Sequence, residues 1–293
     1  MSGFGPVIAA MATPFNEYNQ LNMDGLRRLI IHLIRHNSSA LLVTGTTGES
    51  PVLSATERLR VWETAVDFAG PLIPVIASVG TNSTRTTCHN IKLAEEAGVD
   101  ALMVVTPYYN QPSQEGLIAH FKQVAQSTDL PILLYHVPER TGVSFQLDTL
   151  TVLMKEKNIV GLVDASGDAG FIAKLKAVAP PGFALYTGDD RLYLDTLKAG
   201  GNGAVSSAAN VVGKQMDQIF EMFKKGLLPE AEAINKGLQP VYEVLHHSPT
   251  PAPLKAVLNR MGLPMGGLRL PLMPLDMFEA DELYESICHL LDE

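Results

Sequence analysis

The sequence predicts a (β/α)₈ barrel with a short helical appendage at its C-terminal end. Three observations support this fold class. Apolar segments alternate with amphipathic helical segments, and the apolar segments lack polar residues at alternate positions, as in parallel strands buried on both faces. Roughly eight such units fill the first ~225 residues, which suits a closed barrel better than an open doubly wound sheet. No glycine-rich dinucleotide fingerprint follows the first strand, which also disfavours the open sheet.

The predicted strands are short and apolar, and their starts are separated by about one strand, one helix and two turns. They span 6–13, 40–46, 74–80, 101–109, 131–137, 159–165, 183–189 and 203–208.

Helix signals lie between these strands and dominate the end of the chain. Ser54 and Glu57 have the spacing of a capping box, and Gly70 follows the helical segment that they begin. After residue 226 no strand pattern occurs, and we expect helices at 227–245, 254–261 and 283–291, separated by proline-rich linkers. The expected division is therefore a barrel over 1–225 and a helical region over 226–293.

Composition excludes several classes of protein. Of 293 residues, 46% are hydrophobic and 18% charged, which gives material for a core and no signature of disorder. The net charge of −9 argues against nucleic acid as a partner. No apolar run reaches the ~18 residues that span a bilayer, and the N-terminus lacks a basic signal region. Two widely separated cysteines fit a reducing compartment, so we expect a cytoplasmic protein.

The active site of a (β/α)₈ barrel lies at the carboxyl ends of its strands, so the polar residues there are the candidates. Four segments stand out, and they read GTTGES at 45–50, TPYYNQPSQEG at 106–116, YHVPERTG at 135–142 and TGDD at 187–190. Glycines in such a turn let the backbone approach a ligand, and paired hydroxyls with free N–H groups suit a carboxylate.

Together these motifs resemble the dihydrodipicolinate synthase/N-acetylneuraminate lyase family, over essentially the whole chain. The resemblance implies a (β/α)₈ barrel that binds pyruvate or a related 2-oxo acid. It also implies a homodimer or a homotetramer built from tight dimers, and no metal or other cofactor.

The resemblance assigns roles by position. Thr46 and Thr47 would hold the carboxylate of the 2-oxo acid, and Thr46, Tyr135 and Tyr109 would form a proton relay. Tyr109 would reach into the site of a neighbouring subunit. Arg140 would bind the carboxylate of a second substrate through its planar fork. Gly188 and Val205 would line the pocket, and Tyr109 with Arg140 favours the synthase branch.

The sequence departs from the family at residue 163. The family's sixth strand normally reads like GIKEATGD, in which the lysine forms a Schiff base with pyruvate, whereas this chain reads GLVDASGD at 161–168. The surrounding residues fix the register, so Val163 stands where the lysine would be. A covalent imine divides a difficult step into easier ones, and acid–base help alone supplies only about 10²–10⁴-fold.

Two interpretations follow, and the first is the prediction. The chain would keep the 2-oxo acid pocket and the Tyr–Thr relay but lack Schiff-base aldolase or synthase activity, serving as a binding, regulatory or partner subunit. Alternatively, it would be a lyase-family enzyme that acts on a 2-oxo acid by non-covalent proton transfer through Tyr135. An engineered loss of the lysine would give the same sequence.

Other polar residues are weaker candidates. His136, His246 and His247 are not spaced as metal ligands with a carboxylate. Asp189 and Asp190 could bind a cation, but a helix N-cap at Asp190 is the favoured interpretation. Asp164 would point away from the barrel interior if Val163 points inward, which indicates a structural role.

Overall fold

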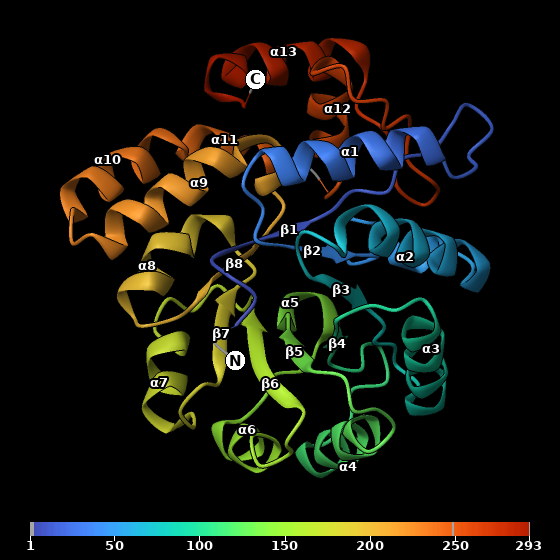
Figure 1. The fold of residues 1–293 in the computed structure, drawn as a ribbon, viewed down its shortest axis with the longest axis vertical. Helices are drawn as coiled ribbons and strands as arrows, with labels where there is room; N and C mark the ends of the chain where they lie inside the picture. Colours follow the sequence, from blue (N-terminus) through green and yellow to red (C-terminus); the bar gives the residue numbers. More distant parts are fainter. Residues whose placement is uncertain (1–2, 248, 293) are drawn as a thin grey trace.

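The chain folds as a closed barrel of eight parallel strands in sequential order, each joined to the next by a helical segment (Figure 1). The computed structural model describes residues 3–247 and 249–292. The strands are β1 (Val7–Ala10), β2 (Ala40–Val43), β3 (Val75–Ser78), β4 (Ala101–Val105), β5 (Ile132–His136), β6 (Ile159–Asp164), β7 (Ala184–Thr187) and β8 (Gly203–Ser206). The predicted fold class is confirmed. The strands are shorter than predicted because their last residues leave the ladder to form loops.

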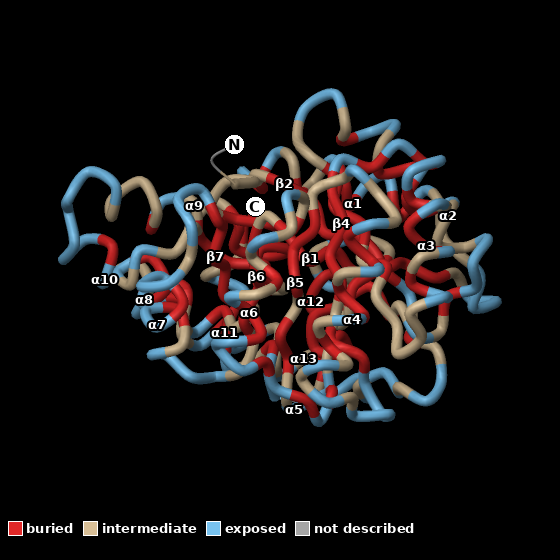
Figure 2. The backbone as a smooth tube through the Cα atoms, turned by 90° about the horizontal axis from the view of Figure 1, so that it is seen from below, coloured by how far each residue is buried: buried red, intermediate tan, exposed pale blue. Residues whose placement is uncertain are grey.

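Alternation along the strands divides the apolar side chains into two layers. The barrel interior is filled by one set, which includes Ile8, Leu42, Met103, Val163, Tyr186 and Val205. The other set faces outward and packs against the helices. Figure 2 shows the strands buried at the centre and the exposed backbone confined to the rim. Residue 163 therefore lies on the interior face of β6, fully shielded from solvent.

Helices surround the strands on all sides of the barrel. They are α1 (Met23–Arg35), α2 (Ala55–Ala69), α3 (Thr84–Glu96), α4 (Gln114–Ala125), α5 (Pro138–Thr141), α6 (Leu147–Leu153), α7 (Phe171–Val178), α8 (Tyr193–Lys198) and α9 (Ala209–Lys224), with 3₁₀ turns η1 (Ser50–Val52) and η2 (Asp190–Leu192). The predicted capping box of α2 is confirmed, because Ser54 and Glu57 exchange side-chain and backbone hydrogen bonds. No helix in the described part of the chain is both long and apolar enough to cross a membrane.

The C-terminal helices pack beside α9 and α1 and away from α3, α4 and α6 (Figure 1). They are α10 (Leu228–Gly237), α11 (Gln239–Leu245), α12 (Ala252–Arg260) and α13 (Met277–Ile287), followed by the 3₁₀ turn η3 (Cys288–Leu290). The prediction of one helix over 227–245 is wrong, since the chain breaks at Leu238 into α10 and α11. Gly237 ends α10, and Pro240, which cannot donate to a preceding turn, lies in the first turn of α11.

Arg269, from the loop between α12 and α13, fastens the C-terminal region to α2. Its guanidinium donates hydrogen bonds to the Glu57 carboxylate, one of them with an N···O distance of 2.9 Å. This contact is the main reason that the pKa of Glu57 falls from 4.5 to about 2. A carboxylate whose pKa is depressed in the fold adds stability above its unfolded pKa and loses it as the pH falls toward the folded value.

Glu57→Gln is therefore expected to make the free energy of unfolding depend less on pH in the acid range. Glutamine keeps an oxygen for the capping box but cannot titrate, so less stability is lost between pH 4.5 and about 2. Thermal unfolding at several pH values in this window measures the difference. Glu63→Gln, at an exposed position of the same helix, is the control. Parallel acid profiles for the wild-type protein and Glu57→Gln would contradict the assignment.

Candidate active site

The turn that follows β2 holds Thr46 and Thr47 at the carboxyl end of the barrel. The Glu49 N–H donates to the Thr46 carbonyl at 3.1 Å, and the Ser50 N–H donates to the Gly45 carbonyl at 3.2 Å. Thr44 and Glu49 have φ angles of 54° and 55°, which β-branched and other non-glycine residues rarely adopt. Such strain persists only where surrounding contacts hold it, and it is common at ligand-binding turns.

A cavity of about 150 Å³ opens at this end of the barrel. It brings together seven residues that the sequence singled out, namely Thr46, Thr47, Tyr135, Arg140, Val163, Gly188 and Val205. The glycine is needed for space, because a Cβ at Gly188 would meet Val163 Cγ1 at 3.5 Å and Ala165 Cβ at 3.0 Å. A volume of this order suits a small molecule of a few heavy atoms.

Tyr109 does not line this cavity. Its side chain is 90% exposed, and its backbone has a φ of 73°. The loop that carries it is held by Asn110, whose side-chain amide donates to the Asn82 carbonyl at 2.9 Å. Tyr109 is therefore not part of the cavity of its own chain.

Tyr135 supplies a hydroxyl to the cavity beside Val163. The two residues are partners in the β5–β6 ladder, so their side chains lie on the same face. Burial raises the pKa of Tyr135 above its usual value, while the hydrogen bond with Thr46 and the charge of Arg140 oppose the shift. Tyr135 is therefore a neutral phenol at physiological pH, and its O–H can donate a proton.

Arg140 is the guanidinium of the cavity that is available to a ligand. Arg191, on the same rim, is engaged by Asp189 through two hydrogen bonds of 2.9 and 2.7 Å. Arg140 is exposed and forms no ion pair with any residue of 3–247 or 249–292. An unpaired guanidinium at a cavity mouth suits an incoming carboxylate.

No lysine lines the cavity among the described residues. Lys155 and Lys157 lie at the opposite end of the barrel, where they border a larger hollow of about 640 Å³ between the loops that precede β5, β6 and β7. Conserved chemistry in barrels belongs to the other end, so we place the site in the smaller cavity. Lys255 is buried, but it is bound to Glu49 behind the turn after β2.

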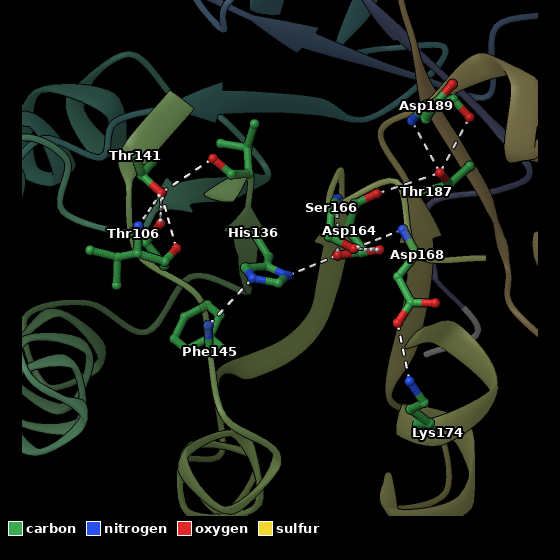
Figure 3. A network of polar contacts seen from close by, with 12 residues as sticks. Thr106, His136, Thr141, Phe145, Asp164, Ser166, Asp168, Lys174, Thr187 and Asp189 are labelled. Carbon is green, nitrogen blue, oxygen red and sulfur yellow. Dashed lines mark hydrogen bonds and ion pairs between the residues drawn. The ribbon is translucent and has the colours of Figure 1, made fainter. Parts of the chain in front are cut away.

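Behind the cavity, a polar network joins the ends of β5, β6 and β7 (Figure 3). His136 Nδ1 donates to Asp164 Oδ1 at 2.8 Å, since His136 Nε2 accepts the Phe145 N–H. Ser166 Oγ also donates to Asp164, at 2.9 Å. Asp164 and His136 are thus buried and satisfied on the outer face of the barrel. The His136–Asp164 hydrogen bond joins the ends of β5 and β6. The preceding residue in each strand, Tyr135 or Val163, faces the cavity.

The prediction of an N-cap at Asp190 is wrong. Asp189 is the N-cap of η2 and accepts from the Arg191 N–H. Asp190 is turned inward, where its carboxylate accepts from Ser207 Oγ at 2.9 Å and the Ala208 N–H at 3.1 Å. The side chain therefore links η2 to the start of α9. Within the described ranges, no three His, Cys, Asp or Glu side chains converge as a metal site.

Sequence reasoning missed part of the cavity wall. Ser207, His246 and Thr250 line it, the last two from the C-terminal region. His246 Nδ1 donates to the Tyr242 carbonyl at 2.7 Å. No local motif marks these residues, and His246 and Thr250 reach the cavity only when the C-terminal helices fold back over the barrel.

Comparison with known proteins identifies the family. The model of the dihydrodipicolinate synthetase family matches residues 3–290. This chain belongs to that family. A 4-hydroxy-tetrahydrodipicolinate synthase 1 of Halalkalibacterium halodurans is 44% identical over 283 residues, covering 97% of this chain and 96% of that protein. A 4-hydroxy-tetrahydrodipicolinate synthase of Bacillus subtilis is 42% identical over 288 residues, covering 98% and 99%.

Solved structures of the dihydrodipicolinate synthetase family have the same fold. A dihydrodipicolinate synthase from Bacillus anthracis superposes with a TM-score of 0.96 at 38% identity, covering 100% of both chains. The one from Thermotoga maritima gives a TM-score of 0.95 at 35% identity, covering 98% of both.

These relatives correct the predicted function. The sequence predicted a binding, regulatory or partner subunit without synthase activity. The alternative was a lyase-family enzyme that acts by non-covalent proton transfer. Relatives about 40% identical over nearly the whole chain are named as synthases, so the prediction of a non-catalytic subunit is wrong. The error came from giving one residue, Val163, more weight than the rest of the site.

Proposed function

We propose that this chain is a synthase of the 4-hydroxy-tetrahydrodipicolinate type. It joins a 2-oxo acid such as pyruvate to an aldehyde that carries a carboxylate and an amine, and the amine closes the ring on the keto group with loss of water. The observation that carries the proposal is the cavity itself. One small space is lined by a hydroxyl-bearing turn, a neutral phenol and an unpaired guanidinium. The names of the relatives supply the reaction class.

The geometry of the cavity supports a role for each residue. Thr46 and Thr47 bind the carboxylate of the 2-oxo acid through hydroxyl and N–H groups in the strained turn. Tyr135, hydrogen-bonded to Thr46, moves the proton during formation of the carbon–carbon bond. Arg140 binds the carboxylate of the second substrate, since its fork matches two carboxylate oxygens.

Residue 163 sets the rate in this proposal. Val163 carries no amine, so no imine with the 2-oxo acid forms at this position. The hydrogen-bonding residues of the cavity must then stabilise the reacting 2-oxo acid by themselves. We expect turnover well below that of a protein with lysine there, because acid–base help alone contributes about 10²–10⁴-fold.

We also infer that a second copy of this chain completes the site. Tyr109 is exposed on a backbone with a φ of 73°, and it does not line its own cavity. A homodimer, or a homotetramer made of two such dimers, would insert the Tyr109 hydroxyl into the partner's cavity and extend the relay from Thr46 and Tyr135.

Arg140→Met tests the assignment of the two carboxylates. The variant is expected to raise KM for the second substrate at least about ten-fold, as for loss of a charge-assisted hydrogen bond, and to leave KM for pyruvate nearly unchanged. Steady-state kinetics with each substrate varied in turn makes the measurement. Arg35→Met, in the last turn of α1, is the control. Equal KM increases for both substrates would refute the separate roles, and unaltered kinetics would remove Arg140 from the site.

A further inference from the structure

The carboxylate-binding turn is attached to the C-terminal region by an ion pair that no solvent reaches. Lys255 of α12 donates from Nζ to Glu49 Oε1 at 2.7 Å, and the two side chains are 1% and 0% exposed. Glu49 lies in the turn that carries Thr46 and Thr47. The two partners are 206 residues apart in the sequence.

Further contacts enclose this pair. Lys255 Nζ also donates to the Gly267 carbonyl, and the Arg269 N–H donates to Glu49 Oε2 at 3.1 Å. The Lys255 and Arg269 side chains each place their charged group 4.3 Å from the ring centre of Phe15. Both Glu49 oxygens are therefore bound by groups of the C-terminal region.

Removing two charges from water costs free energy, so a buried ion pair adds little net stability. Apolar residues of similar volume often stabilise a protein as well or better, whereas removal of one partner leaves an uncompensated buried charge. Buried ion pairs are best attested where they specify one geometry. Here the geometry in question is local, since Glu49 has a φ of 55° and its N–H closes the turn on the Thr46 carbonyl.

We propose that Glu49 and Lys255 are positioning residues that hold the 45–50 turn in its ligand-binding conformation, so that the C-terminal region 226–293 controls binding of the 2-oxo acid. The proposal rests on the proposed function for the identity of the ligand. Neither residue lines the cavity, so both act through Thr46 and Thr47.

Lys255→Met is the principal test. The variant keeps the apolar stem but leaves the Glu49 carboxyl group buried without its ammonium partner. We expect pyruvate affinity, measured by calorimetry, to weaken at least about ten-fold, as for loss of a charged hydrogen bond. The double variant Glu49→Gln with Lys255→Met removes both charges and keeps an oxygen for the Arg269 N–H. It is expected to recover most of the lost affinity.

Hydrogen exchange provides a readout that needs no ligand. In Lys255→Met the Glu49 and Ser50 amides, which close the turn, should exchange at least about ten-fold faster, because local opening sets the rate. The Ala165 amide donates to the His136 carbonyl at 2.7 Å, between the ends of β6 and β5, and its exchange rate should be unaffected. Lys198→Met, which removes the exposed pair with Glu232, is the control for loss of an ion pair in general.

The outcomes separate the inference from the proposed function. Lower affinity together with faster exchange in the turn supports it. A lower melting temperature with unchanged affinity and unchanged exchange at Glu49 and Ser50 overturns it, since that pattern belongs to a structural pair. If the wild-type protein binds no pyruvate, the proposed function fails, and the exchange rates alone decide whether Lys255 holds the turn.

Discussion

Val163→Lys is expected to form an imine with pyruvate and to raise synthase turnover, because a covalent intermediate divides one difficult step into two easier ones. Residue 163 faces the barrel interior on β6, next to Tyr135 in the neighbouring strand. An amine there would point into the cavity that holds the 2-oxo acid. Burial among apolar side chains favours the neutral amine, which is the form that attacks a carbonyl.

Borohydride reduction in the presence of pyruvate, followed by intact-protein mass measurement, detects the imine. Val163→Met is the matched control, because methionine has a similar length and no amine. The wild-type protein and Val163→Met should gain no mass, and the lysine variant should be modified at residue 163. A folded lysine variant that gains no mass would show that the cavity does not present pyruvate to residue 163.

Tyr135→Phe is expected to lower turnover by about 10²–10⁴-fold, the range for a positioned acid–base group. The change removes one oxygen and leaves the ring packed beside Val163 and Gly188. Affinity for pyruvate should change much less, since the Thr46–Thr47 turn binds the carboxylate.

The barrel offers a control with the same chemistry. Tyr186 also lies inside it, paired with Val163 in the β6–β7 ladder, but its hydroxyl accepts the Phe4 N–H at 2.8 Å and does not line the cavity. Tyr186→Phe should therefore leave turnover nearly unchanged. Equal losses in the two variants would mean that Tyr135 contributes packing and not proton transfer.

The fold was predictable from sequence because apolar continuity and helical periodicity act over short distances. Eight strands could be placed from segments such as 40–46 and 159–165, and the capping box at Ser54 and Glu57 is a four-residue pattern. The break at Leu238 was missed, since the periodicity on either side of it is continuous and only Gly237 and Pro240 signal it.

The cavity was predictable only in part. Residues at strand ends, such as Thr46 and Tyr135, can be assigned to the cavity once the barrel fold is predicted. Residues that depend on the path of the C-terminal region were not predictable. His246, which lines the cavity, and Lys255, which binds Glu49 in the turn after β2, are of this kind. Val163 misled the functional prediction because one apolar residue at a strand end is visible in the sequence, whereas the geometry of the remaining site is not.

Product formation by the wild-type protein tests the central claim most directly. Purified protein is incubated with pyruvate and an aldehyde that carries both a carboxylate and a primary amine, which supplies the ring nitrogen. The condensation product is quantified by mass spectrometry against a reaction without protein and a reaction with Tyr135→Phe. The account predicts slow, protein-dependent formation of 4-hydroxy-tetrahydrodipicolinate, abolished or strongly reduced in Tyr135→Phe. Pyruvate binding without any product above the two controls would contradict it.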